Sequence, residues 1–175
     1  MMLTQLGSSM PVDVMPGDTD PSNFLLPQQP MRECLVPSAS QYSSIQHSTN
    51  PHDVSLDGVR VLGTSGQPIA DMHRYTDGRS VLDTMSDTLH ASHIAPTAPD
   101  TLCCLPFFEQ DPFVLTECPH IYFAGCQGAF GSRLVTGQDG QKVQMVAVPS
   151  FATTESIVLV NLRTLAAHEV CFSAS

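Results

Sequence analysis

The sequence predicts an α/β protein whose C-terminal end is α+β, with strands that pair mainly in antiparallel fashion. Residues 59–62 form an apolar strand, and a glycine-rich turn at 63–66 separates it from a helical region. From residue 120 onward, short apolar runs alternate with turns that contain Gly, Asp and Ser. The first pattern is typical of α/β folds, and the second of antiparallel strands.

The first 57 residues are predicted to be rich in loops. Seven prolines fall in this region, at positions 11, 16, 21, 27, 30, 37 and 51. Its clearest element is a short strand at 12–15, which ends in a turn at 16–21. Because this strand is largely apolar, we expect it in the middle of a parallel sheet whose other strands precede it.

A helix is predicted over residues 80–94. Its apolar side chains recur with the period of an α-helix, at Val81, Leu82, Met85 and Leu89. Two prolines then end the helical pattern, at Pro96 and Pro99.

The last third of the chain predicts strands at 120–124, 132–136, 143–148, 157–161 and 169–172. Between the second and third of these, Asp139 and Gly140 form the expected tip of a hairpin.

Composition excludes two classes of partner. The 175 residues, enough for one domain, carry 7 basic and 17 acidic side chains, a net charge of −10, and Lys142 is the sole lysine. Strong direct binding to DNA needs many Lys and Arg contacts to phosphate, so we do not expect it. No apolar run approaches the ~20 residues of a membrane span, so we expect no membrane partner.

The cysteine content predicts free thiols. The N-terminus shows no basic region followed by a long apolar stretch, so no signal peptide is expected. The six cysteines are then those of a cytosolic or nuclear protein, in which disulfides are rare.

Three loops follow apolar strands and carry polar groups, at 17–20, 62–66 and 123–128. Loops at the carboxyl ends of strands converge on one crevice, which is where metallophosphoesterases place their ligands. Gly-rich turns also follow strands for structural reasons alone, so both interpretations stand.

Two other sites have partial support. Five potential zinc ligands lie close together in the sequence: Cys103, Cys104, Cys118, His120 and Cys126. Their spacing lacks the Cys-x₂₋₄-Cys pair that favours tetrahedral binding. The turn at 63–67 is similar to a nucleophile elbow around a serine, but Gln stands at its fifth position in place of Gly. Neither pattern favours a site.

Long blocks of the sequence resemble a known family. They are VDVMPGDTDPSN (12–23), LPQQP (26–30), DGVRVLGTSGQ (57–67), HIAPTAPDTL (93–102), CPHIYFAG (118–125) and VNLRTLA (160–166). Together they resemble the small, regulatory B-subunits of DNA polymerase delta over nearly the whole chain.

The resemblance implies part of a calcineurin-like metallophosphoesterase fold, a β-sandwich flanked by helices. Residues 1–175 would be the C-terminal portion of this inactive domain. The first half of the domain, and the family's N-terminal oligonucleotide/oligosaccharide-binding (OB) fold, would be absent from this chain.

The resemblance also implies a decayed catalytic centre. Asp18 would replace an Asn ligand, Thr19 a catalytic His, and Asp20 would keep the acidic end of that motif. A lone ligand His would correspond to Ser65, and two further histidines to Cys126 and Gly128. Thr, Ser and Gly cannot replace imidazole as ligand or proton donor, so we expect no enzyme, metal or cofactor. The alternative is a metal-dependent phosphoesterase or nuclease.

The partners that the resemblance implies are other components of the polymerase. In that family the small subunit forms a bridge between the cysteine-rich C-terminal domain of the catalytic subunit and a third, elongated subunit. The expected role is therefore that of a non-catalytic scaffold in DNA replication, located in the nucleus.

Three phenylalanines, at Phe107, Phe108 and Phe113, lie in a loop bounded by prolines. No periodicity assigns them to a core. Either the loop folds back and buries them, or they form an apolar patch for a partner.

Overall fold

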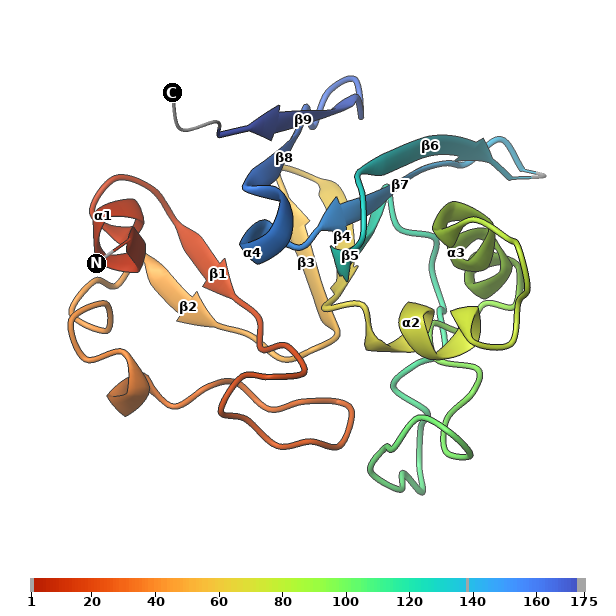
Figure 1. Cartoon of the computed structure of the whole chain (residues 1–175), viewed down its shortest axis with the longest axis horizontal. Helices are drawn as coiled ribbons and strands as arrows, with labels where there is room; N and C mark the ends of the chain where they lie inside the picture. The colour runs from red at the N-terminus through yellow and green to blue at the C-terminus, as the bar shows by residue number, and fades with distance from the viewer. Residues whose placement is uncertain (1, 138, 173–175) are drawn as a thin grey trace.

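A five-stranded mixed sheet lies at the centre of the molecule (Figure 1). The computed structural model describes residues 2–137 and 139–172. The strands are β3 (His52–Leu56), β4 (Val59–Thr64), β5 (Ile121–Gln127), β6 (Gly131–Thr136) and β7 (Lys142–Pro149), in the order β3-β4-β5-β7-β6. The central strands β4, β5 and β7 are parallel, whereas β3 and β6 run antiparallel at the edges. The mixed α/β architecture is as predicted.

Two small sheets flank the central one. β1 (Val12–Val14) pairs in parallel with β2 (Ile45–His47), and β8 (Ser156–Val160) pairs antiparallel with β9 (Ala167–Cys171). Within the described residues β1 pairs only with β2, which follows it in sequence. The expectation that further strands precede β1 in a larger sheet stays a prediction. Asp13 is exposed on β1, and its carboxylate lies 3.0 Å from Nε2 of His52 on β3.

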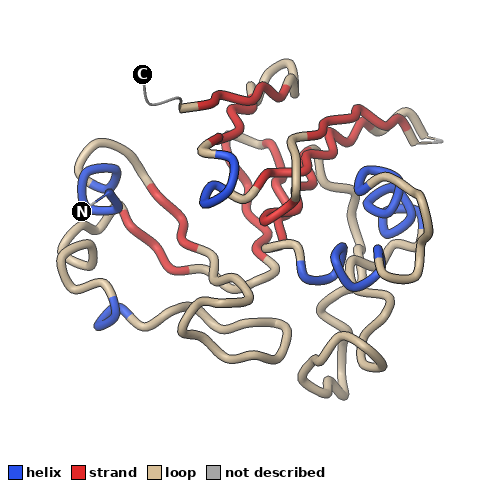
Figure 2. The backbone as a smooth tube through the Cα atoms, viewed as in Figure 1, coloured by secondary structure: helices blue, strands red, loops and turns tan. Residues whose placement is uncertain are grey.

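Five helical segments complete the described chain: α1 (Met2–Gly7), η1 (Glu33–Leu35), α2 (Gln67–His73), α3 (Val81–His90) and α4 (Phe151–Thr154). Of the helices in residues 2–137 and 139–172, none combines the length and apolar character needed to cross a membrane. Loops make up most of the backbone between β1 and β2 and between α3 and β5 (Figure 2).

The core lies between one face of the sheet and the helices α2 and α3. Met85 of α3, Tyr122 of β5 and Met145 of β7 are completely buried there. The phenol oxygen of Tyr122 lies 3.2 Å from the hydroxyl of Thr88, and burial raises the pKa of Tyr122 to about 12. Alternating residues of β5 and β7 therefore form the hydrophobic layer that holds α3.

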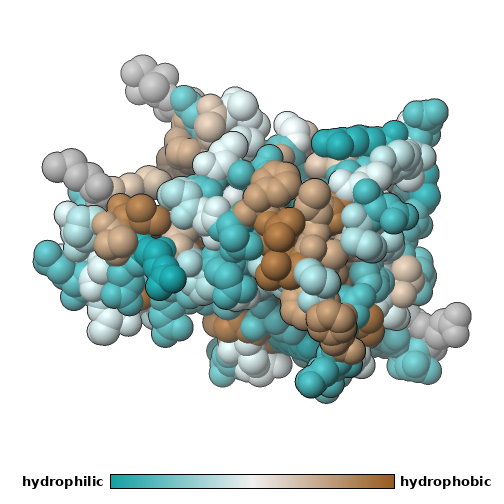
Figure 3. All heavy atoms as spheres, turned by 90° about the horizontal axis from the view of Figure 1, so that it is seen from below, coloured by the Kyte–Doolittle hydropathy of each residue, from teal (hydrophilic) through white to brown (hydrophobic). Residues whose placement is uncertain are grey.

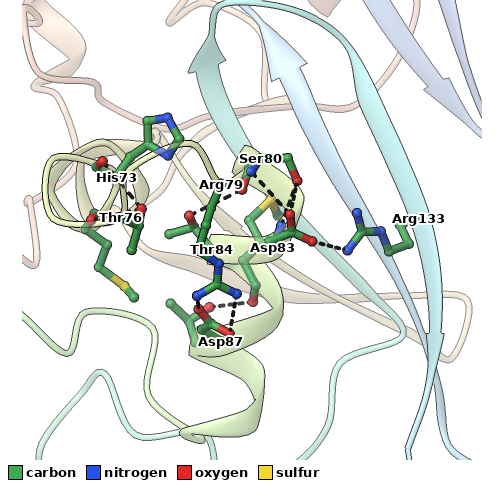
Figure 4. Close-up of polar contacts among 11 residues, drawn as sticks. His73, Thr76, Arg79, Ser80, Asp83, Thr84, Asp87 and Arg133 are labelled. Atoms are coloured by element: carbon green, nitrogen blue, oxygen red, sulfur yellow. Dashed lines mark hydrogen bonds and ion pairs between the residues drawn. The ribbon is translucent and has the colours of Figure 1, made fainter.

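Polar contacts fix both ends of α3 (Figure 4). Ser80 caps the helix, because its hydroxyl accepts the amide N–H of Asp83, and the Asp83 carboxylate in turn accepts the N–H of Ser80. Arg133 of β6 donates to Asp83 at 2.7 Å, and Arg79 forms an ion pair with Asp87. The hydrogen bonds from Ser80 and Arg133 hold the pKa of Asp83 well below its usual range. The contact between Arg133 and Asp83 joins α3 to the edge strand β6.

The opposite face of the sheet is also apolar. A groove of ≈ 450 Å³ separates it from the β8–β9 hairpin, with Val61, Phe123 and Val146 on the sheet side and Val158 and Val160 on the hairpin side. The hairpin therefore covers this face only in part.

Two hairpins connect the edge strands to the centre. At the β3–β4 turn, Asp57 and Gly58 both have positive φ, of 50° and 80°, which is the signature of a type I′ turn. The β6–β7 hairpin contains Asp139 and Gly140, as predicted, and Gly140 has a φ of 80°.

Candidate functional site

The three polar loops that follow β1, β4 and β5 meet at one edge of the fold. A Cβ added to Gly17 would lie 3.8 Å from Cβ of Ser65, so the first two loops are in contact. Gly66 has a φ of 105°, and a Cβ added there would lie 2.1 Å from the carbonyl oxygen of Gly125. Only glycine allows the second and third loops to approach this closely.

A network of neutral side chains holds these loops together. Its centre is Asn50, which is completely buried just before β3. Its Nδ2 lies 2.8 Å from Oε1 of Gln28, 2.8 Å from Oγ of Ser65 and 2.9 Å from Oε1 of Gln67. Its Oδ1 accepts the backbone N–H of Ser65 at 3.1 Å. One amide thus joins its own segment to two others that are distant in sequence, one at Gln28 and one at Ser65 and Gln67.

The same network reaches the loop after β1. Nε2 of Gln28 lies 3.0 Å from the carbonyl oxygen of Gly17, and Nε2 of Gln67 lies 3.0 Å from Oε1 of Gln28. Amides and hydroxyls neither gain nor lose a proton near neutral pH. This network can therefore position backbone, but its members cannot act as a general acid or base.

The carboxylates of the first loop point outward. Asp18, Thr19 and Asp20 are all exposed. Asp20 accepts the N–H of Gly17 at 2.7 Å, which closes its own turn. The contact is local, so this loop carries acidic groups at the rim of the network rather than inside it.

The third loop is shaped by a β-bulge in β5. The pairing of β5 with β7 shifts between Ala124 and Gln127, and Cys126 has a φ of 55°. Positions 126 and 128 are thereby exposed, whereas Gln127 is buried, with its Nε2 2.7 Å from the carbonyl oxygen of Gly125. The bulge therefore turns Cys126 outward, away from the buried amides.

Ser65 occupies a turn between β4 and α2, as a nucleophile elbow would require. Its hydroxyl contacts the amides of Asn50 and Gln67. An elbow serine needs an imidazole to accept its proton. The amides that contact Ser65 cannot supply that function, so these contacts do not favour a nucleophile elbow.

The cysteine and histidine side chains are dispersed. All six cysteines are free, and those at 103, 118 and 126 are exposed. Nδ1 of His120 accepts the backbone N–H of Arg60 at 3.0 Å. In residues 2–137 and 139–172, no three His, Cys, Asp or Glu side chains lie together as a metal site would require.

The phenylalanine loop between α3 and β5 divides into two parts. Phe113 is only 2% exposed and belongs to the core, so it cannot belong to an exposed patch. Phe107 and Phe108 are 47% and 97% exposed. Next to the buried ring, Oδ1 of Asp111 accepts the backbone N–H of Phe113 at 2.9 Å.

Sequence patterns do not reveal the amide network. Gln28 and Gln67 lie within blocks that resemble the family, and nothing in the sequence marks Asn50. No periodicity indicates a buried amide, because its partners are 15 to 22 residues away in the chain. The Asn-Pro step at 50–51 indicates only a turn.

Comparisons with known proteins place the chain in a family. Residues 1–132 match the family of B subunits of DNA polymerases alpha and epsilon. The chain is 47% identical over 99% of its length to the DNA polymerase delta small subunit of Arabidopsis thaliana, of which it covers 39%. It is 45% identical over its full length to the DNA polymerase delta small subunit of Oryza sativa subsp. japonica, of which it covers 41%.

An animal relative gives the same result. The chain is 48% identical over 94% of its length to DNA polymerase delta subunit 2 of Drosophila melanogaster, of which it covers 38%. It thus spans about two-fifths of the length of these relatives. The chain belongs to the B-subunit family of DNA polymerases alpha and epsilon, and within it is similar to the small subunits of DNA polymerase delta.

Proposed function

We propose that this chain acts as a non-catalytic accessory subunit of DNA polymerase delta. The observation that carries the proposal is the amide network around Asn50. It lies where three loops meet, and its polar groups are hydrogen-bonded to one another rather than directed at a substrate. A crevice of this kind serves to hold loops in place.

The fold that we propose for residues 1–175 is the C-terminal portion of an inactive calcineurin-like phosphoesterase domain. Two features support it. The chain covers 38–41% of three relatives, which is consistent with part of a larger protein, and its parallel strands are followed by loops that meet at one edge. In this proposal Thr19, Ser65, Cys126 and Gly128 occupy positions where an active enzyme has imidazoles.

The proposed mechanism is the binding of partner subunits rather than catalysis. We propose that the chain holds the cysteine-rich C-terminal domain of the catalytic subunit and the third subunit in fixed relation, in the nucleus. A rigid sheet is suited to this role, and a net charge of −10 favours basic partner surfaces over nucleic acid.

Co-expression tests the assembly. The chain is produced with the tagged catalytic subunit of polymerase delta and with the third subunit, separately and together. We expect a stoichiometric complex on size-exclusion chromatography that withstands dilution. A chain that folds, by circular dichroism, but elutes alone from every mixture would refute the accessory role.

A second measurement tests the absence of catalysis. Hydrolysis of bis(4-nitrophenyl) phosphate is followed with added Mn²⁺, and we expect no turnover above that of the Asp18→Ala variant. Asp18→Ala is the informative control because its carboxylate is exposed and its loss leaves the core intact. Turnover that this substitution abolishes would favour the metal-dependent phosphoesterase or nuclease instead.

A further inference from the structure

The loop between α3 and β5 presents apolar side chains to solvent. Phe108 is 97% exposed, and Phe107 and Val114 are each 47% exposed. The loop projects from the lower side of the molecule in Figure 1, and the view from that side in Figure 3 shows apolar residues gathered near the middle of the face. Exposed aromatic side chains so close together are uncommon on surfaces that bind nothing.

The loop is anchored at both sides of these residues. After them, the Ile94 N–H donates to the carbonyl of Phe113 at 2.9 Å, and Nε2 of His93 lies 3.0 Å from Oδ2 of Asp111. Before them, the Leu105 N–H donates to the carbonyl of Leu26 at 2.8 Å. The exposure of Phe108 therefore occurs between two fixed points rather than at a free end.

A groove lies beside this loop. Its volume is ≈ 320 Å³, and its apolar wall includes Pro27, Ile94, Phe107, Pro112 and Leu115. A volume of this size holds a few side chains of an extended chain but not a helix or a second domain. Phe107 belongs to both the groove and the exposed pair, so the two form one surface.

The charges around this surface indicate which class of partner it would bind. Residues 100–117 contain four carboxylates, at 100, 109, 111 and 117, and the chain has neither Lys nor Arg between Arg79 and Arg133. The one cation that lines the groove is Arg60. Its guanidinium donates to Asp53 at 2.7 and 3.1 Å and to Glu117 at 2.7 Å, so it is already neutralised by two carboxylates.

We propose that Phe107, Phe108 and the adjacent groove form a docking surface for an extended protein segment that carries an apolar anchor flanked by Lys or Arg. The apolar anchor enters the groove beside Phe107, and the basic residues face the carboxylate of Glu109, which follows Phe108 directly. Nucleic acid is disfavoured because its phosphates would meet the same carboxylates. A second copy of this chain is disfavoured because it is acidic too.

A selection experiment tests the chemistry. The full chain is immobilised and a phage-displayed library of random 12-residue peptides is selected on it, with the Phe107→Ser/Phe108→Ser double variant as counter-selection. We expect enriched peptides with net positive charge and at least one large apolar residue. Their affinity, measured by fluorescence anisotropy, should fall at least 10-fold with the double variant, since truncated aromatic anchors typically cost that much.

Matched controls separate the surface from general stickiness. Phe151→Ser removes a phenylalanine of 48% exposure from α4 and should leave the affinity unchanged. Glu109→Lys should weaken binding, and added salt should weaken it further, because the flanking contacts are electrostatic. Enriched peptides that are neutral or acidic, or that bind the double variant equally well, would overturn the proposal.

The outcome is independent of the accessory role. The inference goes beyond that role, and peptide selection uses no other component of the polymerase. If the chain assembles with polymerase delta subunits but selects no basic apolar peptide, the docking surface is refuted and the accessory role stands. If basic apolar peptides bind and no complex forms, the accessory role is refuted and the docking surface stands.

Discussion

Replacement of Asn50 is the sharpest test of the amide network. In Asn50→Ala the backbone N–H of Ser65 loses its acceptor, Oδ1 of Asn50, in a buried site. The side-chain groups of Gln28 and Ser65 keep Gln67 as a partner. An orphaned buried donor costs about 1–3 kcal/mol, and the small cavity adds roughly 1 kcal/mol. We therefore expect a loss of about 3 kcal/mol in the free energy of unfolding.

Urea unfolding followed by circular dichroism measures this loss, and thermal unfolding should show a decrease of about 6–12 °C in Tm. Gln46→Ala is the control: Gln46 is an exposed amide on β2, and its truncation should change stability by less than about 0.5 kcal/mol. A loss under about 1 kcal/mol for Asn50→Ala would refute the reasoning, because it would mean that water replaces the amide.

Asn50→Asp adds a pH readout. A carboxylate at this position would face the oxygens of Gln28 and Gln67 that Nδ2 of Asn50 now contacts. Only a protonated carboxyl can donate to them, so the folded state raises its pKa above the unfolded value of about 3.9. The destabilisation should therefore be small below pH 4 and grow as the pH rises to 7.

Three further predictions concern the core and the turns. Gly66→Ala should cost at least about 3 kcal/mol in the free energy of unfolding, or prevent folding, because a Cβ there meets the carbonyl of Gly125; Gly140→Ala, also at positive φ but in open space, should cost only about 1 kcal/mol. Met85→Ala should cost about 2–5 kcal/mol in urea unfolding, against less than about 0.5 kcal/mol for the exposed Met10→Ala. Burial raises the pKa of Tyr122 to about 12, so its contribution to stability is complete below the unfolded value of about 10 and is lost as the pH rises toward 12; stability measured from pH 9 to 11 should fall less steeply in Tyr122→Phe.

Local patterns predict the elements that local interactions determine. Helix α3 is predicted because its apolar stripe is evident in the sequence, although it ends at His90 rather than at residue 94. Strands β5 to β9 each lie within a few residues of the predicted ranges. Strand β3 is not among the predicted strands, although Asp57 and Gly58 are a common signal for a two-residue hairpin.

The site was less accessible to prediction, because its contacts are not local. Asn50 is defined by partners from two other segments, one at Gln28 and one at Ser65 and Gln67, and no residue type or spacing indicates that an amide will be buried. The phenylalanine loop gives a similar lesson. Phe108 and Phe113 are the same residue type in the same loop, yet Phe108 is exposed and Phe113 packs in the core, through contacts with segments distant in sequence. The roles of Asp18, Thr19, Asp20, Ser65, Cys126 and Gly128 as former catalytic positions stay a prediction.

The parallel pairing of β4 with β5 has a consequence for how the chain folds. Val61 on β4 pairs with Ile121 on β5. The central sheet therefore closes only when two residues 60 positions apart in the sequence come together. Closing so long a loop costs conformational entropy before any contact repays it. The β3–β4 and β6–β7 hairpins need only short closures, so they can form early, and β5 then joins them by pairing with β4 on one side and β7 on the other. The rate of folding should therefore depend on the meeting of two preformed halves, with α2 and α3 packing as that meeting occurs.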